Sequence, residues 1–183
     1  LLAAQVPVRA QSEAGGSATS PTVTRREAAF LDRVQAVSAT NVTAALALFD
    51  EIELAEASPA LDFALCNLSV EGDRLDEAEA AYRRALEKMP RFVRARANLG
   101  RVYLLQGEAR AAADELRRMV RAGEGDAKVY ILLGQAFLLD DRSVAAETAF
   151  RQALLLGPEA VQAELGLAKC LFLQERHREG AAL

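Results

Sequence analysis

LGRVYLLQGE, residues Leu99 to Glu108, recurs 34 residues further on as LGQAFLLDDR, residues Leu133 to Arg142. Both copies keep leucine, glycine and an aromatic residue at the same spacing, and Ala112 matches Ala146 in the same register. A fixed period of about 20–50 residues is typical of solenoids, in which each unit buries its apolar face only against its neighbours. The repeat therefore predicts a solenoid.

The composition favours helices over sheets. Hydrophobic residues make up 51% of the 183 residues, but aromatic residues make up only 5%, so alanine and leucine supply most of the apolar side chains. Both are strong helix formers and neither favours strands. We therefore expect an all-α fold. Because no apolar run reaches the ~18 residues of a membrane span, we expect no such span.

The charge is unevenly distributed along the chain. The net charge is −4, yet residues 83–121 contain eleven Lys and Arg against four Asp and Glu. The overall charge argues against nucleic acid as a partner, whereas the basic segment could steer an acidic protein or peptide. A solvated helix surface explains the same segment without any partner.

The N-terminal residues lack helical periodicity. Residues 1–10 contain an apolar run, and Val8 and Ala10 stand at the −3 and −1 places of a signal-peptidase site, so we interpret them as a signal-peptide remnant. This interpretation predicts a periplasmic or secreted bacterial protein. The alternative is an ordinary extension of a cytoplasmic protein. Residues 11–23 are rich in Gly, Ser, Thr and Ala and predict a flexible linker.

Capping and breaking residues divide the rest of the chain into helices. Thr24 and Glu27 form a capping box, and Ser58 precedes a proline suited to the first helical position. The predicted helices span residues 24–40, 41–54, 59–70, 76–89, 92–106, 109–122, 127–139, 143–156 and 161–174. Residues 24–57 would form a degenerate helical pair and residues 58–183 the repeats. The last repeat is incomplete, because the final RHREGAAL is short for a second helix, and we expect the natural chain to continue.

The repeats resemble the tetratricopeptide repeat, a 34-residue helix–turn–helix. In residues 127–158 the resemblance rests on Tyr130-x2-Leu133-Gly134-x2-Phe137, Ala146-x3-Phe150, Ala153 and Pro158. In residues 93–126 it rests on Leu99-Gly100-x2-Tyr103 and Ala112-x3-Leu116. The preceding unit has Ala78-x3-Tyr82 and Pro90 but no Leu-Gly pair, and we interpret its turn, GDRLDEA, as one residue longer. The resemblance implies a right-handed superhelical α-solenoid with a concave binding surface.

Little in the sequence points to catalysis. His177, the only histidine, lies in the charged stretch QERHREG with no nucleophile or metal-ligand motif beside it. The chain also lacks a phosphate-binding glycine loop and a cysteine cluster. Cys66 and Cys170 stand three repeats apart, too far for a disulfide. We therefore expect no enzyme activity, no catalytic residue, no cofactor and no metal.

Binding is better supported, because the first helix of each pair would present one face to the concave surface. That face combines apolar residues with spaced basic and amide side chains, which suits a peptide that has acidic and apolar groups. The candidate binding residues are Arg94, Asn98, Arg101, Lys128, Ile131, Gln135, Leu138, Lys169 and Phe172, and the same face carries Leu105, Leu139 and Leu173. Alternatively, neighbouring helices cover these apolar residues.

The expected function is that of a non-enzymatic scaffold that binds a peptide or protein segment, with envelope assembly or export as its setting. The family's carboxylate clamp for chaperone tails needs Lys and Asn one turn apart on a first helix. Asp62 and Cys66, and then Ala97 and Arg101, stand at the matching places, so a chaperone-tail adaptor is disfavoured. Two alternatives remain: a structural spacer or oligomerisation arm, and a regulatory repeat region of a larger multidomain protein.

Overall fold

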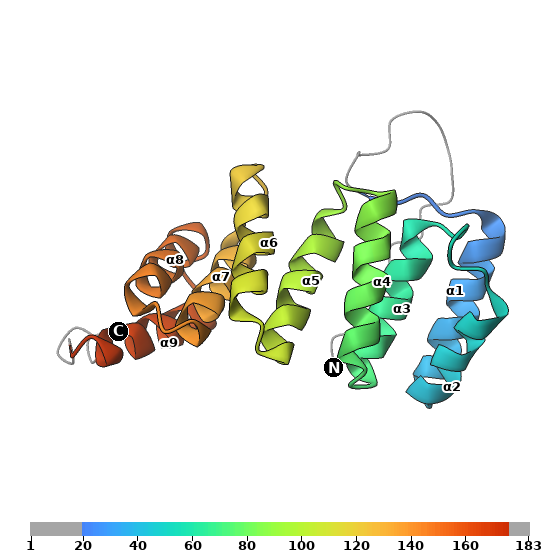
Figure 1. Cartoon of the computed structure of the whole chain (residues 1–183), viewed down its shortest axis with the longest axis horizontal. Helices are drawn as coiled ribbons and strands as arrows, with labels where there is room; N and C mark the ends of the chain where they lie inside the picture. The colour runs from blue at the N-terminus through green and yellow to red at the C-terminus, as the bar shows by residue number, and fades with distance from the viewer. Residues whose placement is uncertain (1–19, 176–183) are drawn as a thin grey trace. The chain divides into compact units, whose positions relative to one another are not determined.

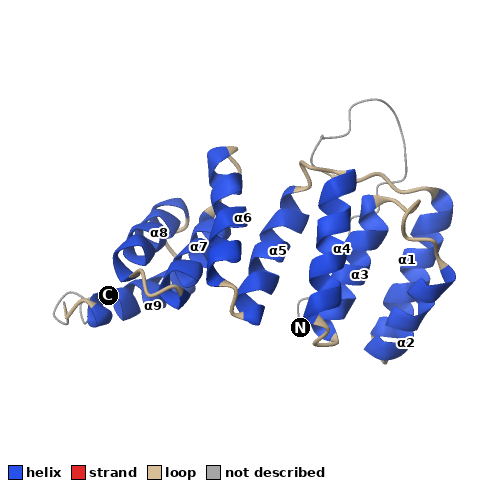
Figure 2. Ribbon diagram, viewed as in Figure 1, coloured by secondary structure: helices blue, strands red, loops and turns tan. Residues whose placement is uncertain are grey.

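The computed structural model describes residues 20–175, and every regular element in this range is a helix (Figures 1 and 2). The helices are α1 (Arg25–Ser38), α2 (Val42–Ala47), the 3-10 turn η1 (Leu48–Glu51), α3 (Pro59–Glu71), α4 (Leu75–Lys88), α5 (Val93–Gln106), α6 (Ala109–Arg121), α7 (Ala127–Leu139), α8 (Ser143–Leu156) and α9 (Val161–Leu173). The predictions for residues 1–10, for most of the linker and for His177 lie outside the described residues.

The predicted helices are found at nearly the predicted positions, except that the second is shorter. The sequence predicts one helix over residues 41–54, whereas α2 ends at Ala47 and continues as η1. Acidic side chains are unfavourable at a helix C-terminus, and Asp50, Glu51 and Glu53 would all have fallen in the last turns. Phe49 remains buried and packs edge-on against Phe30, with ring centroids 5.2 Å apart.

The chain divides into two compact units, which we call unit 1 (residues 1–95) and unit 2 (residues 96–183). In unit 1, α1 and α2 pack against each other and against α3, η1 packs against α2, and α3 pairs with α4. In unit 2, α7 packs against α6, α8 and α9. Each unit buries its own apolar side chains between successive helices, as expected for stacked helical pairs.

The turns within the helical pairs repeat with the 34-residue period. One residue in each turn adopts a left-handed conformation, at Asp73 (φ 57°), Gly107 (φ 82°), Asp141 (φ 56°) and Glu175 (φ 60°). The next backbone N–H donates back to the preceding helix in the same way each time, from Arg74 to Ser69, from Glu108 to Tyr103 and from Arg142 to Phe137, at 2.7–2.8 Å. The expectation of a longer turn at residues 72–74 is therefore wrong. The turn has ordinary length, but this repeat lacks the Leu-Gly pair, so its length could not be recognised from the sequence.

A capping box joins α1 to the start of α3. The Glu27 carboxylate accepts from the backbone N–H of Thr24 at 2.7 Å and, through its other oxygen, from the backbone N–H of Ser58 at 2.8 Å. Partial burial acts to raise the pKa of Glu27, but these hydrogen bonds outweigh it and hold the pKa below its ordinary value. These hydrogen bonds connect the N-terminal helical pair to the first repeat.

A buried ion cluster provides a second connection within unit 1. Asp62 of α3 is fully buried, and its carboxylate accepts from Lys88 Nζ at 2.6 Å and from Arg84 Nε at 3.1 Å. Lys88 also donates to the carbonyl oxygens of Leu54 and Ala57, in the connection that leads into α3. Because a buried charge is costly unless it is paired, this cluster favours one arrangement of the connection.

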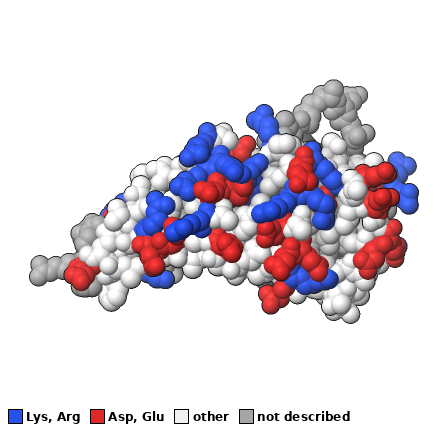
Figure 3. All heavy atoms as spheres, viewed as in Figure 1, with Lys and Arg blue, Asp and Glu red and all other residues white. Residues whose placement is uncertain are grey.

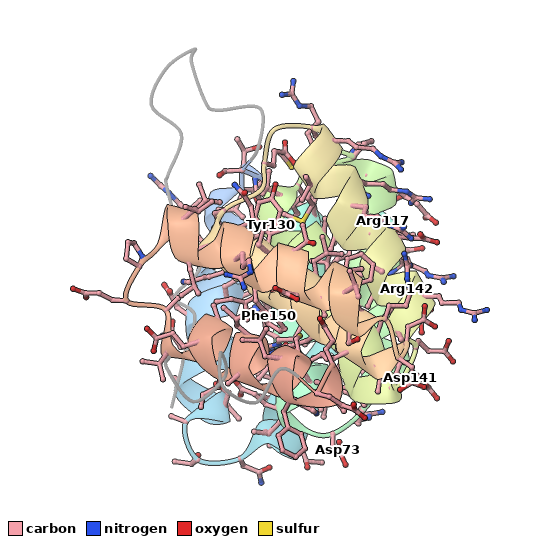
Figure 4. The ribbon with its side chains drawn as sticks, turned by 90° about the vertical axis from the view of Figure 1, so that its left-hand side faces the viewer. Asp73, Arg117, Tyr130, Asp141, Arg142 and Phe150 are labelled. Atoms are coloured by element: carbon pink, nitrogen blue, oxygen red, sulfur yellow. The ribbon has the colours of Figure 1, made fainter. Side chains whose placement is uncertain are left out.

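In unit 2, the ring of Phe150 fills the space left by two glycines (Figure 4). A Cβ atom would come within 2.7 Å of this ring at Gly134 of α7 and within 2.4 Å at Gly166 of α9. The preceding pair uses Gly100 and Leu116 at the equivalent positions, with a closest approach of 3.0 Å. Glycine is needed at these positions because the helices and the ring approach closely.

Replacing Gly134 with alanine should destabilise the protein. The clash with Phe150 should cost about 1–3 kcal/mol and exceed the gain of about 1 kcal/mol in helix propensity. Phe150→Leu, which reproduces the preceding pair, should restore part of this loss in the double variant. Urea unfolding of the wild type, both single variants and the double variant measures the coupling. A Gly134→Ala variant more stable than the wild type would contradict this packing.

The contribution of Glu27 should depend on pH. A pKa that is lower in the folded than in the unfolded state contributes stability above the unfolded pKa of about 4.3, and the contribution is lost as the pH falls through the folded value. Glu27→Gln should therefore reduce the free energy of unfolding by about 1 kcal/mol at pH 7, as for other helix caps. The difference from the wild type should shrink below about pH 4.3. Unfolding curves from pH 3 to pH 7 test this, with the exposed Glu56→Gln as the control expected to show no such trend.

Candidate functional site

The described residues offer little for catalysis. Between residues 20 and 175, no three His, Cys, Asp or Glu side chains are grouped so as to hold a metal ion. Cys66 and Cys170 are both buried and free. Burial raises the pKa of the Cys66 thiol well above its ordinary range and raises that of Cys170 to about 11. Both therefore remain protonated at neutral pH and are poor nucleophiles.

The predicted binding residues lie on the first helices of the pairs, on α5, α7 and α9. Six of the nine are exposed: Arg94, Arg101, Lys128, Gln135, Lys169 and Phe172. Asn98 and Leu138 are partly buried. Ile131 is only 7% exposed and belongs to the core of unit 2. The suggestion that it contacts a ligand has to be corrected, because α7 packs against α6, α8 and α9 and these neighbours leave little of it uncovered.

Two rows of exposed side chains run across the first helices of unit 2. The polar row consists of Arg101, Gln135 and Lys169, and the apolar row consists of Leu105, Leu139 and Leu173. Residues within each row are 34 apart, and each polar residue precedes a leucine by four, so both lie on one face of the same helix. The leucines are between 49% and 57% exposed. Such an apolar row beside hydrogen-bonding and basic groups can contact a partner without rearranging the core.

Most arginines of the basic segment are already paired. Six of them form ion pairs: Arg83 with Glu79, Arg84 with Asp62, Arg96 with Glu115, Arg110 with Asp140, Arg117 with Asp114 and Arg118 with Glu115. Figure 3 shows acidic and basic side chains intermingled over the visible surface. The arrangement favours a solvated helix surface for much of the segment.

Other arginines stack on aromatic rings. The guanidinium carbon of Arg94 lies 5.1 Å from the centroid of Phe63 in unit 1. In unit 2, Arg142 and Arg117 lie 4.8 Å and 5.9 Å from the centroid of Phe137 (Figure 4). Stacking of this kind contributes to packing as well as to charge. Arg94 is therefore a weaker candidate for ligand binding than its exposure indicates.

Three cations on the predicted face remain available to a partner. Within residues 20–175, Arg101, Lys128 and Lys169 form no ion pair. Sequence reasoning found these three residues from their helical register, but it could not separate them from the paired arginines. Pairing depends on which acidic side chain the neighbouring helix presents, and only the packed structure determines that.

Removing one of these cations should cost little stability. We expect Arg101→Ala and Lys128→Ala each to change the free energy of unfolding by less than about 0.5 kcal/mol. Arg96→Ala should cost about 1–2 kcal/mol, because it removes a 2.7 Å ion pair with the largely buried Glu115. Urea unfolding compares the three variants. A loss at Arg101 as large as that at Arg96 would show that Arg101 is structural.

In the described part of the chain, none of the helices combines the length and apolar character needed to cross a membrane.

Two family models described as tetratricopeptide repeat match the chain, one over residues 70–136 and the other over residues 131–183. Comparison with curated proteins gives no match. These matches cover both complete repeats and the incomplete one after them.

Several solved structures are similar. MamA 41-end from Desulfovibrio magneticus RS-1 matches with a TM-score of 0.78 and 19% identity, over 88% of this chain and 92% of that one. MamA AMB-1 matches with a TM-score of 0.73 and 21% identity, over 86% and 92%. The tetratricopeptide domain of Arabidopsis OM64 matches with a TM-score of 0.59 and 19% identity, over 61% and 93%. At these identities the likeness shows the fold alone, which is an all-α α-solenoid.

Proposed function

Because the chain belongs to the tetratricopeptide-repeat family, we propose that it captures an extended protein segment along the first helices of its repeats. Tetratricopeptide repeats are non-enzymatic interaction modules, so the chain is a protein–protein interaction scaffold. The proposal concerns which surface binds and what kind of segment it takes.

The observation that carries this proposal is the pair of exposed rows in unit 2. The family's packing explains the buried leucine, glycine and aromatic positions, but it does not require Leu105, Leu139 and Leu173 to remain exposed at one repeated position. Exposed apolar residues aligned in this way are a common feature of interaction sites. The adjacent Arg101 and Lys169, together with Lys128 near the start of α7, add positive charge that is not neutralised by ion pairs within the described residues.

The spacing of the rows suggests the form of the ligand. Packed helices are about 8–10 Å apart, so successive leucines should be separated by a similar distance. A polyproline II helix rises about 3.1 Å per residue and brings every third side chain to the same side. An extended segment with an apolar residue at about every third position would therefore place one apolar group beside each leucine. Acidic residues between them would lie near the basic groups.

We also place this function in the periplasm or outside the cell, in envelope assembly or export. The support is the leader-like pattern of residues 1–10. The cytoplasmic alternative predicts that residues 1–10 stay attached to the mature protein. The N-terminal residue of the protein isolated from its host, determined by mass spectrometry, distinguishes the two locations.

Charge reversal should abolish most peptide binding. We expect Arg101→Glu/Lys128→Glu to lower the affinity for acidic-apolar peptides by about tenfold or more, because two attractive contacts become repulsive. Binding by the wild type should also weaken as salt is raised. A peptide array selects the ligands, and fluorescence anisotropy of selected peptides then measures affinity.

The matched control is Arg91→Glu/Arg121→Glu, which makes the same charge change at two exposed positions that belong to neither row. It should retain binding. Leu139→Ser should weaken binding without changing the salt dependence. If the Arg101→Glu/Lys128→Glu variant keeps every peptide that the wild type binds, the proposed face is not the site.

A further inference from the structure

Two exposed apolar side chains of α8 depart from the pattern of the repeats. Leu155 is 77% exposed and Val144 is 68% exposed, which makes them the most exposed large apolar residues of the described range. The equivalent positions of the earlier second helices all carry exposed charged residues: Arg110 and Arg121 in α6, Asp76 and Glu87 in α4. The second helices therefore present charge to the solvent at these two positions, except in α8.

The exposure of these two positions follows from the repeat and does not depend on what comes after α9. Helix α6 is followed by a complete pair, α7 and α8, and packs against α7. Nevertheless, the Arg110 side chain is 88% exposed, and Arg121 is exposed as well. A following pair thus leaves both positions uncovered, and Val144 and Leu155 occupy the same positions one period later.

One side of α8 forms an outward face, which we define as Val144, Thr148, Arg151 and Leu155. Their spacing of i, i+4, i+7 and i+11 places them on one side of the helix, and all four are exposed. Arg151 donates through Nε to the Glu147 carboxylate at 2.9 Å, so its charge is paired within α8. The outward face therefore has an apolar residue at each end and two polar residues at its centre.

The order of these residues suits an antiparallel pair of identical helices. When Val144 of one helix lies opposite Leu155 of the other, the reversed direction also brings Thr148 opposite Arg151. Two-fold symmetry then repeats each of these contacts. Apolar ends meet apolar ends, and the Arg151 guanidinium, which has five N–H donors, can donate to the hydroxyl oxygen of Thr148.

Other arrangements of two copies fit less well. A parallel pair would place Arg151 beside the same arginine of the other copy, and like charges in contact are unfavourable. Docking of the outward face on α6 of another copy would set Arg110 and Arg121 against apolar side chains, which desolvates charges without pairing them. Docking on the apolar row would be heterologous and would build open chains of copies. The pattern favours the antiparallel contact.

We propose that the outward face of α8 binds the same face of a second copy of this chain, antiparallel and about a two-fold axis. Val144 packs against Leu155 at both ends of the contact, and Arg151 donates to Thr148 at its centre. The contact closes at a dimer and leaves both rows uncovered, so the dimer is a bivalent scaffold. One helix from each copy makes a small interface, and the association should therefore be weak and reversible.

Charge variants test both the contact and its direction. Sedimentation equilibrium of the full chain should show concentration-dependent dimers for the wild type. Val144→Glu and Leu155→Arg should each weaken the dimer about tenfold or more, because a charge would face an apolar side chain. The double variant Val144→Glu/Leu155→Arg should recover dimers, since antiparallel pairing places each introduced glutamate opposite an introduced arginine. A mixture of the two single variants should likewise associate more tightly than either variant alone.

Three outcomes would overturn the proposal. A wild type that remains monomeric up to about 1 mM has no such contact. A double variant as weak as the single variants excludes antiparallel pairing. Oligomers larger than a dimer that disappear in Leu105→Ser would show docking on the apolar row. Leu155→Arg introduces the residue that α6 carries at this position, so the fold should be retained, and circular dichroism verifies this for each variant.

Cysteine crosslinking measures the direction of the contact independently. Under mild oxidation, Val144→Cys should crosslink with Leu155→Cys in a mixture of the two variants. Neither variant should crosslink with itself, because its two introduced thiols lie at opposite ends of the contact. The native Cys66 and Cys170 are buried and should stay reduced. Self-crosslinking of either variant would show a parallel contact and contradict the proposal.

The dimer and the peptide-binding surface can be tested separately. Val144 belongs to neither row, so Val144→Glu should weaken the dimer and leave peptide affinity unchanged. Arg101→Glu/Lys128→Glu should weaken peptide binding and leave the dimer unchanged, because neither residue lies on α8. A dimer weakened as much by this charge reversal as by Val144→Glu would show that the copies meet through the rows, and the inference of a contact through α8 would be wrong.

Discussion

The close approach of Phe150 to two helices at once is the constraint on which the arrangement of unit 2 depends. The ring occupies space that a Cβ atom would need at both Gly134 and Gly166. It thereby connects the first helix of its own pair to the first helix of the next. Dense packing of this kind tolerates neither a larger residue nor a void without cost. The helices α7, α8 and α9 are therefore held by one interlocked set of side chains.

Unit 1 adds specific polar contacts to its apolar core. Its first repeat lacks the Leu-Gly pair, and its connection to the N-terminal helical pair relies on hydrogen bonds from Lys88 to backbone carbonyl groups and from Ser58 to Glu27. The fully buried Asp62 pairs with both Lys88 and Arg84, which favours the observed position of Lys88 because a buried charge is costly unless it is paired. These polar contacts supplement the apolar cluster that the N-terminal helical pair forms with Ala60, Leu61 and Leu68 of α3.

The helices could be predicted closely because the 34-residue period supplies several aligned copies of the same signal. Predictions failed where a segment had no second copy for comparison or where packing decided the outcome. The helix predicted over residues 41–54 ends early, since its acidic end opposes helix formation and Phe49 packs well from the 3-10 turn. The turn at residues 72–74 has ordinary length because a non-glycine residue, Asp73, adopts the left-handed conformation that Gly107 adopts in the next repeat. Ile131 has the register of a surface residue, but its helix is covered on several sides.

The sequence by itself determined the family, the all-α architecture, nearly all helix boundaries and the first-helix register on which the candidate binding residues lie. These properties follow from periodicity and capping, which are local and repeated. Only the tertiary structure decided which charged residues are paired within the molecule and which apolar residues remain exposed. Arg96 and Arg101 are both arginines of α5, yet one forms an ion pair with Glu115 of α6 and the other does not. The reason is physical: pairing and burial depend on which side chains the neighbouring helix places at that point. The sequence of one helix does not determine which side chains of another helix will lie against it.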